Sequence, residues 1–267
     1  MPELPEVETI RRALEPALTG RTIVDSGAFA SAKFSDATLA TGSTIEAVHR
    51  RGKYLILPLD NGNEMIVHLG MTGVLRTMSV HTSDDKFLRA WWQLDDARVF
   101  EFSDVRRFGR VAVVRGGDYS GLPTLATLGP EPLSAHFTSD GFYRALNQSS
   151  RAIKTQLLSQ RPVAGVGNIY ADEACWIARV RPAARSITKP SAARLRDAIR
   201  EVLAAAIRRS GTTLRDYRTV DGGYGEHQHH LFAYGRFGQP CQRCATPLRR
   251  SVVDARTTTH CPTCQRT

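Results

Sequence analysis

Hydrophobic residues near the N-terminus recur at every third or fourth position, as they do on one face of a helix. Val7, Ile10, Leu14 and Leu18 form this stripe, and Arg11 and Arg12 lie on the other side. Gly20 follows the last member of the stripe, and glycine commonly stands just after the end of a helix. The pattern therefore predicts a first helix that ends near Gly20.

The pattern changes after the first helix to short runs of β-branched and aromatic residues, which turn signals separate. The six runs that predict strands are 22–30, 53–59, 63–69, 89–94, 98–102 and 110–114. No helical pattern stands between them, and consecutive short strands favour an antiparallel sandwich or barrel.

The segment 128–134 breaks the strand pattern, and the chain beyond it is predicted to be helical. The predicted helices span 139–148, 152–160, 170–180 and 189–210. Ser139 or Asp140 is expected to cap the first of these helices. The last helix carries one apolar stripe, composed of Leu195, Ile199, Val202, Leu203, Ala206 and Ile207.

Four cysteines near the C-terminus, Cys241, Cys244, Cys261 and Cys264, form two C-x2-C pairs. Residues 248–260 between the pairs predict a hairpin that returns the second pair to the first. Four thiolates in tetrahedral array suit one structural Zn²⁺ ion, because they leave no coordination position open for catalysis. Disulfides or an iron–sulfur cluster are the alternatives.

These patterns together predict an α+β multidomain fold. An N-terminal helix and an antiparallel β-sandwich would form residues 1–132, and a helical domain would form residues 133–220. Residues 221–267 would contain a loop and a zinc-binding β-hairpin.

The chain of 267 residues has a net charge of +10, which makes a polyanion its expected partner. Nucleic acid and an anionic membrane surface both fit that charge. No apolar run is long enough to span a bilayer, and the first residues lack the order of a signal peptide. We therefore expect a cytoplasmic protein without a membrane segment.

Residues 163–173, "VAGVGNIYADE", place a glycine-rich turn before a predicted helix. Gly165 and Gly167 permit a tight turn, and Asn168 could cap the helix. Exposed N–H groups at a helix N-terminus bind anions. The pattern fits a phosphate clamp or a simple helix connector.

The remaining candidate ligands and thiols have simpler interpretations. His227, His229 and His230 match no common metal spacing, so a solvated loop is expected there. Cys175 lies in an apolar helical stretch and is expected to be a core thiol.

The chain begins "MPELPEV", with acidic residues close to a proline at position 2. Removal of Met1 would leave Pro2 with a free secondary amine. Because the reference pKa of an α-amino group is about 7.7–8.0, part of it is neutral at physiological pH. Such an amine can attack a sugar C1′ and form an iminium, with Glu3 as acid and base. Taken alone, a Met-Pro start is more often an ordinary terminus without this chemistry, and Lys53 is more often a surface lysine.

The chain resembles the formamidopyrimidine-DNA glycosylase/endonuclease VIII family over nearly its whole length. The matching blocks occur in order: "PELPEVETIRR", "RRGKYLIL", "HLGMTGVLR", "RRFGR", "LGPEPL", "IKTQLLSQRPVAGVGNIYADE", "GTTLRD", "YGRFGQPC" and the zinc hairpin. "PELPEV" is similar to the formamidopyrimidine branch. Enzymes of this family remove oxidised bases from DNA and nick the strand.

The resemblance implies a role for each of five residues in catalysis. Pro2 would be the nucleophile at C1′, and Glu3 would open the sugar ring and help to expel the base. Glu6 would support both from the first helical turn. Lys53 would donate a proton during β-elimination and hold phosphate, and Arg256 would grip phosphate and assist δ-elimination.

The resemblance also implies a set of DNA contacts. Met71, Arg106 and Phe108 would fill the gap that an everted nucleotide leaves in the duplex. Asn168 would hold a phosphate through a helix–two-turn–helix motif. The remaining predicted DNA contacts are Arg151 and Lys154.

The sequence departs from the family pattern at four places. Val105 stands where proline is usual, and Phe87 replaces a histidine that contacts DNA, for which Arg89 could compensate. Ser149 stands at a usually basic position, although Arg151 is near. The loop 221–234 differs from the usual lesion cap, which has a Gly–Tyr–Phe type sequence. These differences affect the expected base preference and DNA affinity, and none touches the nucleophile.

The predicted function is a bifunctional DNA glycosylase and AP lyase of base excision repair, active as a monomer on double-stranded damaged DNA. It would excise oxidised purines, 8-oxoguanine and formamidopyrimidines, by β,δ-elimination. The alternatives are the same chemistry directed at oxidised pyrimidines or abasic sites, and a non-catalytic zinc protein that binds damaged DNA.

Overall fold

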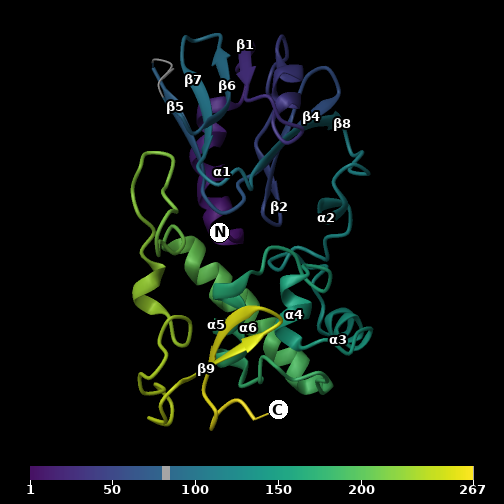
Figure 1. Cartoon of the computed structure of the whole chain (residues 1–267). Coiled ribbons are helices and arrows are strands. Elements are labelled where there is room, and N and C mark those ends of the chain that lie inside the picture. The colour runs from purple at the N-terminus through teal and green to yellow at the C-terminus, as the bar shows by residue number, and fades with distance from the viewer. Residues whose placement is uncertain (80–84, 267) are drawn as a thin grey trace. The chain divides into compact units, whose positions relative to one another are not determined.

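The structure is a computed structural model that describes residues 1–79 and 85–266 (Figure 1). The helices are α1 (Leu4–Leu18), α2 (Pro123–Ala126), α3 (Ser139–Asn147), α4 (Ile153–Leu158), α5 (Asn168–Ala178) and α6 (Lys189–Arg208), with 3₁₀ helices η1 (Ser35–Ala40) and η2 (His227–His230). The strands are β1 (Ile23–Ala28), β2 (His49–Arg51), β3 (Tyr54–Pro58), β4 (Asn63–His68), β5 (Gly73–Met78), β6 (Leu88–Leu94), β7 (Val99–Asp104), β8 (Arg110–Arg115), β9 (Arg249–Val253) and β10 (Arg256–His260).

The chain divides into two compact units. The first contains Met1–Ala126 and Ser210–Glu226, and the second contains Thr127–Arg209 and His227–Thr267. The segment Ser210–Glu226 therefore packs with the N-terminal part of the chain. The predicted division, by contrast, assigned residues 133–220 and 221–267 to two consecutive domains.

The first unit contains two four-stranded antiparallel sheets, with strand orders β1-β6-β7-β5 and β2-β3-β4-β8. Side chains from α1 and from both sheets share one buried core, which includes Leu14, Leu57, Val67 and Phe102. Two sheets that enclose a common core form a sandwich, as the strand pattern predicts.

All six predicted strands are present, but the structure adds β2 and β5. β2 has only three residues, and all three are polar. In β5 only Gly73 and Leu75 are buried, so the alternation of apolar residues is short. Both strands exist because neighbouring strands supply their hydrogen-bond partners, which a local pattern does not contain.

The second unit contains the predicted helices and the hairpin. The apolar stripe of α6 is buried throughout, as predicted. Two predicted helix caps are wrong. The N-cap of α3 is Thr138 and not Ser139 or Asp140, and its side chain accepts a hydrogen bond from the Gly141 N–H. The N-cap of α5 is Gly167, which leaves Asn168 as the first helical residue.

Strands β9 and β10 form the predicted hairpin, and a two-residue turn joins them. Its central residues, Asp254 and Ala255, have φ angles of 44° and 61°. Such turns favour Asn-Gly, because residues other than glycine are strained at positive φ. The Thr155 hydroxyl donates a hydrogen bond to the Asp254 carboxylate, which fixes the turn against α4.

No helix in the described part of the chain is both long and apolar enough to cross a membrane.

Candidate functional site

Residues 2–8 are buried, whereas Met1 is exposed. Glu3 is the N-cap of α1 and forms a capping box with Glu6. The Glu3 N–H donates to Oε2 of Glu6 at 2.8 Å, and the Glu3 side chain accepts from the backbone N–H of Glu6. Pro2 is buried beside them. This reciprocal capping fixes the backbone that carries Pro2, where a chain terminus would otherwise fray.

The second oxygen of Glu6 binds a different segment. Its Oε1 accepts the N–H of Thr212 at 2.7 Å. At neighbouring Gly211 the φ angle is +82°, and an added Cβ would lie 2.8 Å from the same carboxylate oxygen. Both oxygens of Glu6 therefore accept backbone hydrogen bonds, and the side chain positions the N-terminus on the segment 210–213.

Lys53 lies in the same unit at the turn between β2 and β3, where it is 3% exposed. Oε2 of Glu8 in α1 pairs with Nε of Arg50 at 2.9 Å. Arg50 in turn donates to the carbonyl oxygen of Gly52 at 3.0 Å. These contacts attach α1 to the residue that precedes Lys53. The interpretation of Lys53 as a surface lysine is therefore wrong.

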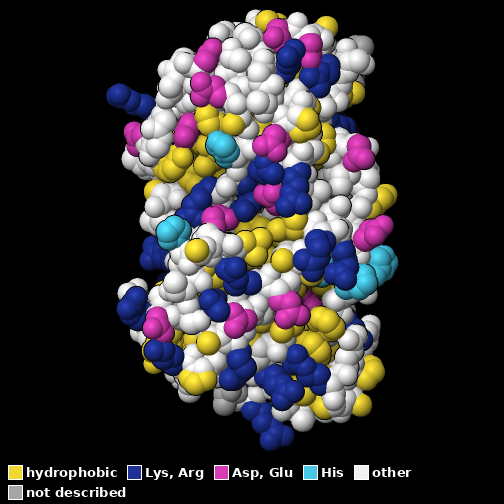
Figure 2. Space-filling view, turned by 180° about the vertical axis from the view of Figure 1, so that it is seen from behind, with side chains coloured by type: hydrophobic (Ala, Val, Ile, Leu, Met, Phe, Trp, Pro, Cys, Tyr) yellow, Lys and Arg dark blue, Asp and Glu magenta, His cyan; other side chains and the backbone are white. Residues whose placement is uncertain are grey.

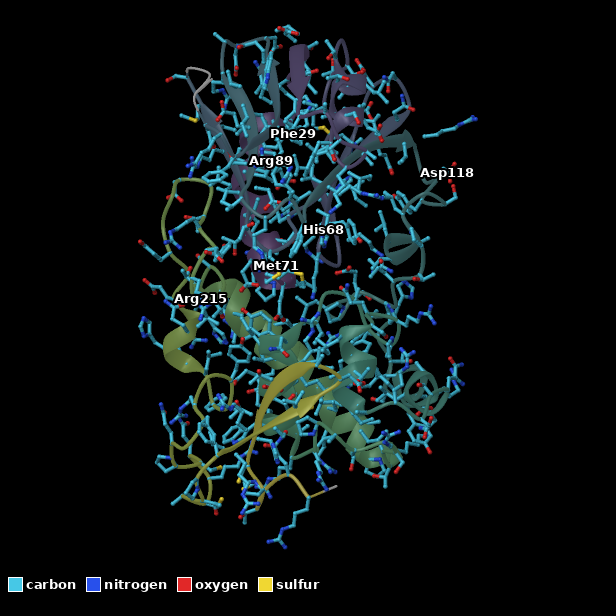
Figure 3. All side chains as sticks on the ribbon, viewed as in Figure 1. Phe29, His68, Met71, Arg89, Asp118 and Arg215 are labelled. Atoms are coloured by element: carbon cyan, nitrogen blue, oxygen red, sulfur yellow. The ribbon has the colours of Figure 1, made fainter. Side chains whose placement is uncertain are left out.

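His68, labelled in Figure 3, ends β4, and the charge of Lys53 acts on its imidazole. Burial, with the positive charges of Lys53 and Arg110, lowers the pKa of His68 to about 4. The imidazole is therefore neutral at physiological pH, and its Nδ1 accepts the N–H of Gly70 at 3.3 Å. This contact shapes the turn that presents Met71.

The three predicted gap-filling residues come together. Nη1 of Arg106 lies 3.2 Å from Sδ of Met71, and the Arg106 guanidinium lies 4.6 Å from the centroid of the Phe108 ring. Met71 is 37% exposed and Phe108 is 50% exposed, although both are large and apolar. An exposed cluster of a thioether, a guanidinium and a ring is suited to replace base stacking.

Asp104, which the sequence analysis did not single out, organises this cluster. Its fully buried carboxylate accepts the N–H of Gly109 at 2.7 Å, the N–H of Arg106 at 3.2 Å and the hydroxyl of Thr72. Asp104 thus joins the loop of Met71 to the loop of Phe108. The signal in the sequence that could have identified Asp104 was an acidic residue close to "RRFG".

Two departures from the family pattern lie near this cluster. Val105 is 54% exposed in place of proline. Arg89, which could have compensated for Phe87, is buried. It donates to the carbonyl oxygens of Asp104, Lys86 and Leu88. Arg89 therefore supports the sandwich and does not present its guanidinium for a DNA contact.

The four cysteine sulfurs of the second unit lie within 4.8 Å of one another. Sγ of Cys244 is 3.5 Å from Sγ of Cys261 and 3.4 Å from Sγ of Cys264. Tetrahedral coordination with Zn–S bonds of about 2.3 Å places sulfurs about 3.8 Å apart. The residues therefore fit Zn²⁺, and these separations far exceed the length of a disulfide bond. Cys175 is a buried free thiol, as predicted, and burial raises its pKa.

Lys154 is fully buried. This differs from the prediction that its ammonium group contacts DNA. Its Nζ lies 2.7 Å from Oδ1 of Asp172 and donates to Thr257 O and Thr258 Oγ1, both at 2.9 Å. Oδ2 of Asp172 accepts the N–H of Thr259 at 2.9 Å. Lys154 and Asp172 therefore hold β10 against α4 and α5, directly after Arg256.

Replacing Lys154 by Met should destabilise the second unit by about 3–5 kcal/mol, because Asp172 would keep a buried charge without its cation. Urea denaturation provides the measurement. Adding Asp172→Asn to Lys154→Met should recover part of the loss. A single substitution costing less than about 1 kcal/mol would contradict a buried ionic contact.

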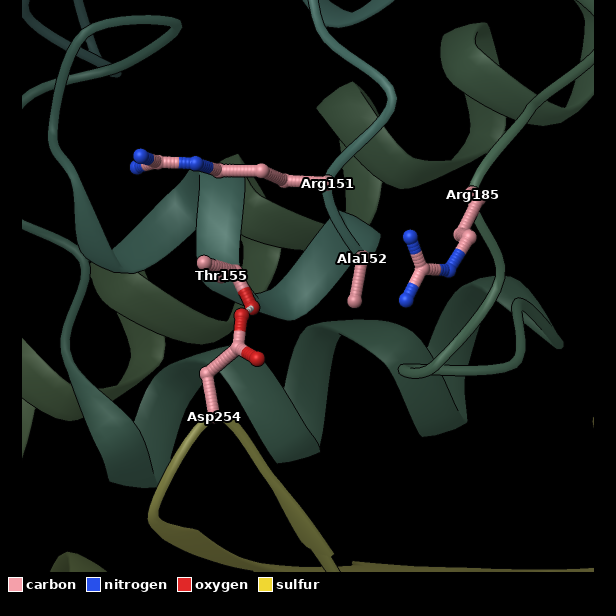
Figure 4. Close-up of a pocket in the computed structure, with 5 residues that line it drawn as sticks. All are labelled: Arg151, Ala152, Thr155, Arg185 and Asp254. Carbon is pink, nitrogen blue, oxygen red and sulfur yellow. Dashed lines mark hydrogen bonds between the residues drawn. The ribbon is translucent and has the colours of Figure 1, made fainter.

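Arg256, Arg151 and Asn168 also belong to the second unit. Arg256 and Arg151 are both exposed. Arg256 lies directly after the hairpin turn, and Arg151 lies two residues before α4 (Figure 4). Asn168 stands at the start of α5, and its Oδ1 is buried without a hydrogen-bond partner among the described residues. These three positions remain predicted DNA contacts.

The atypical loop contains an unexpected buried histidine. His227 is 3% exposed and packs near Tyr170 and His230, so the prediction of a fully solvated loop is wrong. Neither ring nitrogen has a hydrogen-bond partner among the described residues. Burial, with the charges of Arg209 and His230, lowers the pKa of His227 to about 4. Tyr224 in the same loop is 64% exposed, beneath the guanidinium of Arg218.

His227→Phe should stabilise the protein by about 1–3 kcal/mol, because it removes two unpartnered buried nitrogens. The gain should be larger at pH 5 than at pH 7. Between about pH 6.5 and pH 4, unfolding allows His227 to take up a proton, so stability falls as the pH falls. Thermal unfolding at both pH values tests this, with His229→Phe at an exposed neighbour as the control. Equal gains at both pH values would contradict the buried neutral imidazole.

Lys and Arg side chains occur over both units on the face shown in Figure 2, interspersed with acidic ones. This distribution agrees with the net charge of +10. A nucleic acid partner fits such a surface.

Three family models match the chain. They are the formamidopyrimidine-DNA glycosylase N-terminal domain at residues 1–111, the formamidopyrimidine-DNA glycosylase H2TH domain at residues 128–218, and a zinc finger found in FPG and IleRS at residues 238–267. The third match identifies the predicted zinc site as a known type.

Relatives match over the full length. The formamidopyrimidine-DNA glycosylase of Thermus thermophilus is 48% identical over 99% of this chain and 98% of that protein. The Deinococcus radiodurans enzyme of the same name is 45% identical over 99% and 97%.

Solved structures agree with the sequence matches. The crystal structure of the Thermus thermophilus protein superposes with a TM-score of 0.92 at 48% identity, covering 99% of this chain and 98% of that one. A Lactococcus lactis enzyme in complex with DNA that contains an abasic site has a TM-score of 0.89 at 34% identity, with 99% and 100% coverage. The chain therefore belongs to the formamidopyrimidine-DNA glycosylase family.

Proposed function

We propose that this chain is a bifunctional DNA glycosylase and AP lyase that excises oxidised purines from double-stranded DNA. The capping box that holds Pro2 and Glu3 in one buried arrangement carries the proposal. A nucleophile and an acid/base group on one rigid segment satisfy the basic requirement of covalent catalysis. A duplex DNA substrate also supports a cytoplasmic, nucleoid-associated location, and the function requires only one copy of the chain.

The proposed reaction begins after Met1 is removed. The secondary amine of Pro2 forms a bond to C1′, the glycosidic bond breaks, and the base leaves with a proton. Glu3 supplies the proton that opens the sugar ring, which leaves an iminium between Pro2 and C1′. Loss of a C2′ proton then expels the 3′ phosphate, and loss of the C4′ proton expels the 5′ phosphate. Water hydrolyses the iminium, which releases the sugar remnant and restores the amine of Pro2.

The other residues act around this centre. Glu6 is a positioning residue, because backbone N–H groups occupy both of its oxygens. Lys53 donates a proton during β-elimination and holds phosphate, and Arg256 assists the second elimination. Met71, Arg106 and Phe108 fill the vacancy in the duplex, which lowers the cost of everting the nucleotide.

The second unit supplies phosphate contacts and a structural metal. Four thiolates hold Zn²⁺ without an open coordination position, so the metal stabilises the hairpin that carries Arg256. Asn168 and Arg151 bind the DNA backbone.

Cleavage of duplexes that carry 8-oxoguanine, formamidopyrimidine, thymine glycol or an abasic site tests the proposal. Oxidised purines and the abasic site should be cut, and borohydride should trap a covalent adduct. Preference for thymine glycol would assign the chain to oxidised pyrimidines. Binding without cleavage or adduct would identify a non-catalytic protein that binds damaged DNA.

A further inference from the structure

The gap-filling loop, residues 105–109 between β7 and β8, carries Arg106 and Phe108. On its buried side, the Asp104 carboxylate accepts two of the loop's backbone N–H groups, at 3.2 and 2.7 Å. A Cβ added at Gly70 would lie 2.4 Å from the loop backbone, so the neighbouring turn packs directly against it. These contacts fix the buried side of the loop and leave its outer side to be held by other residues.

The backbone of the loop is strained at Arg107. Its φ angle is 55°, in the left-handed region that residues other than glycine, asparagine and aspartate rarely adopt. Such a conformation persists only where the surroundings hold it. The Arg107 guanidinium lies 5.6 Å from the centroid of the Phe29 ring, and that of Arg89 lies 5.1 Å from the same centroid (Figure 3). This contact involves the side chain only, so the peptide group of Arg107 needs a separate restraint.

Lys33 supplies that restraint from a distant part of the sequence. Its Nζ donates to the carbonyl oxygen of Arg107 at 2.9 Å and lies 5.9 Å from the centroid of the Phe108 ring. A hydrogen bond from an ammonium group to a carbonyl is stronger than one between neutral groups. Because the Arg107 carbonyl belongs to the peptide group that leads into Phe108, Lys33 fixes the backbone from which the ring projects.

Lys33 is itself attached to the strand that follows the loop. Its carbonyl oxygen accepts the N–H of Val111 in β8 at 2.8 Å, and its own N–H donates to Oγ of Ser31 at 3.3 Å. The backbone of Lys33 is therefore held at β8, while its side chain reaches back to Arg107. This arrangement ties the outer side of the gap-filling loop to the sandwich.

We propose that Lys33 is a positioning residue of the gap-filling cluster, which holds the loop so that Arg106 and Phe108 are in place before a nucleotide is everted. The inference rests on the proposed function. A side chain that is ordered in advance does not have to be ordered at the moment when it enters the duplex. Lys33 would therefore act on eversion and not on the chemistry at Pro2.

The test follows insertion of the cluster by stopped-flow fluorescence of 2-aminopurine, placed beside the cytosine that pairs with 8-oxoguanine. Lys33→Met keeps the aliphatic chain and removes the donor, and it should slow the fluorescence rise about tenfold, because eversion of a paired base costs a few kcal/mol. Lys33→Arg keeps a donor and the charge, and it should retain most of the rate. Lys86→Met is the matched control, since its ammonium group lies over a different ring, 5.0 Å from the centroid of Phe87, and its rate should be unchanged.

A double variant tests whether Lys33 acts through the ring of Phe108. In a Phe108→Ala background, Lys33→Met should slow single-turnover excision of 8-oxoguanine little further, because the ring that Lys33 positions is absent. Borohydride trapping on an abasic duplex tests the proposed lyase separately. Lys33→Met should leave that trapping nearly unchanged, since an abasic site has no base to evert.

Equal slowing by Lys33→Met with and without the Phe108 ring would overturn the proposal, and so would equal slowing by Lys86→Met. Binding to a duplex with a tetrahydrofuran abasic analogue over a range of salt concentrations tests a direct DNA contact. An unchanged insertion rate in Lys33→Met, with a slope of log K against log salt reduced by about one phosphate contact, would overturn the positioning role. Thermal unfolding confirms that the variants fold.

Discussion

A form of the protein in which Pro2 remains within a peptide bond should form no borohydride-trapped adduct with abasic DNA. The lone pair of an amide nitrogen is delocalised into the carbonyl group, so it cannot attack C1′. Strand cleavage should fall by more than about 10³-fold, as expected when the nucleophile of a covalent mechanism is lost. The comparison needs an N-terminal tag that a protease removes to leave Pro2 first. Activity should appear only after the tag is removed.

Two controls separate loss of the nucleophile from loss of structure. The tagged and processed forms should bind a tetrahydrofuran duplex with affinities within a few-fold of each other. Pro2→Gly, once Met1 is removed, presents a primary amine and should retain part of the trapping. An adduct on the tagged protein that maps to Lys53 would contradict the assignment of Pro2. Active enzyme with Met1 still attached, shown by intact mass, would contradict it equally.

Local patterns predicted those parts of the fold that depend on residues close together in sequence. The stripes of α1 and α6, the six strand runs and the two cysteine pairs each carry their own signal. The grouping of Met71 with Arg106 and Phe108 came from the family resemblance, and their contacts agree with it. No pattern in the sequence would have brought those three residues together.

Residues whose partners are distant in the chain were misjudged or missed. Lys154 is expected to contact DNA from the sequence, but Asp172 and strand β10 enclose its ammonium group in the structure. His227 is expected to be solvated from the sequence, but it is buried near the ring of Tyr170 in the structure. The role of Asp104 depends on two loops that meet at its carboxylate, one through Thr72 and the other through Gly109. Tertiary contacts reversed the expectation for Lys154 and His227 and gave Asp104 a role that was not expected, because burial depends on partners that local sequence does not contain.

Removing zinc with a chelator should abolish strand cleavage and unfold the C-terminal hairpin. Structural zinc contributes an apparent free energy of about 10–16 kcal/mol in small zinc domains, which is comparable to the stability of a whole protein. The cysteine cluster shares its small core with α5, where Cys241, Cys261 and Leu248 pack with Trp176 and Ala233. Loss of the metal should therefore disturb α5 as well as the hairpin.

Trp176 provides the spectroscopic readout for this loss. Arg243, between the first two cysteines, places its guanidinium 3.8 Å from the centroid of the Trp176 ring and donates to the carbonyl oxygens of Trp176 and Ile177. The ring of Phe232 stacks on the same indole, with centroids 4.6 Å apart. Release of the metal should free Arg243 and shift the Trp176 emission towards that of a solvated indole.

Trp176→Phe is the matched control, because the fluorescence change should disappear while the requirement for zinc persists. The two sheets of the first unit contain no part of the metal site, so strand circular dichroism should largely remain after chelation. Readdition of zinc should restore the emission and the cleavage together. If cleavage persisted in protein from which the metal had been removed, the hairpin would hold Arg256 without zinc. The contacts of Lys154 and Asp172 would then be the main restraint on that strand.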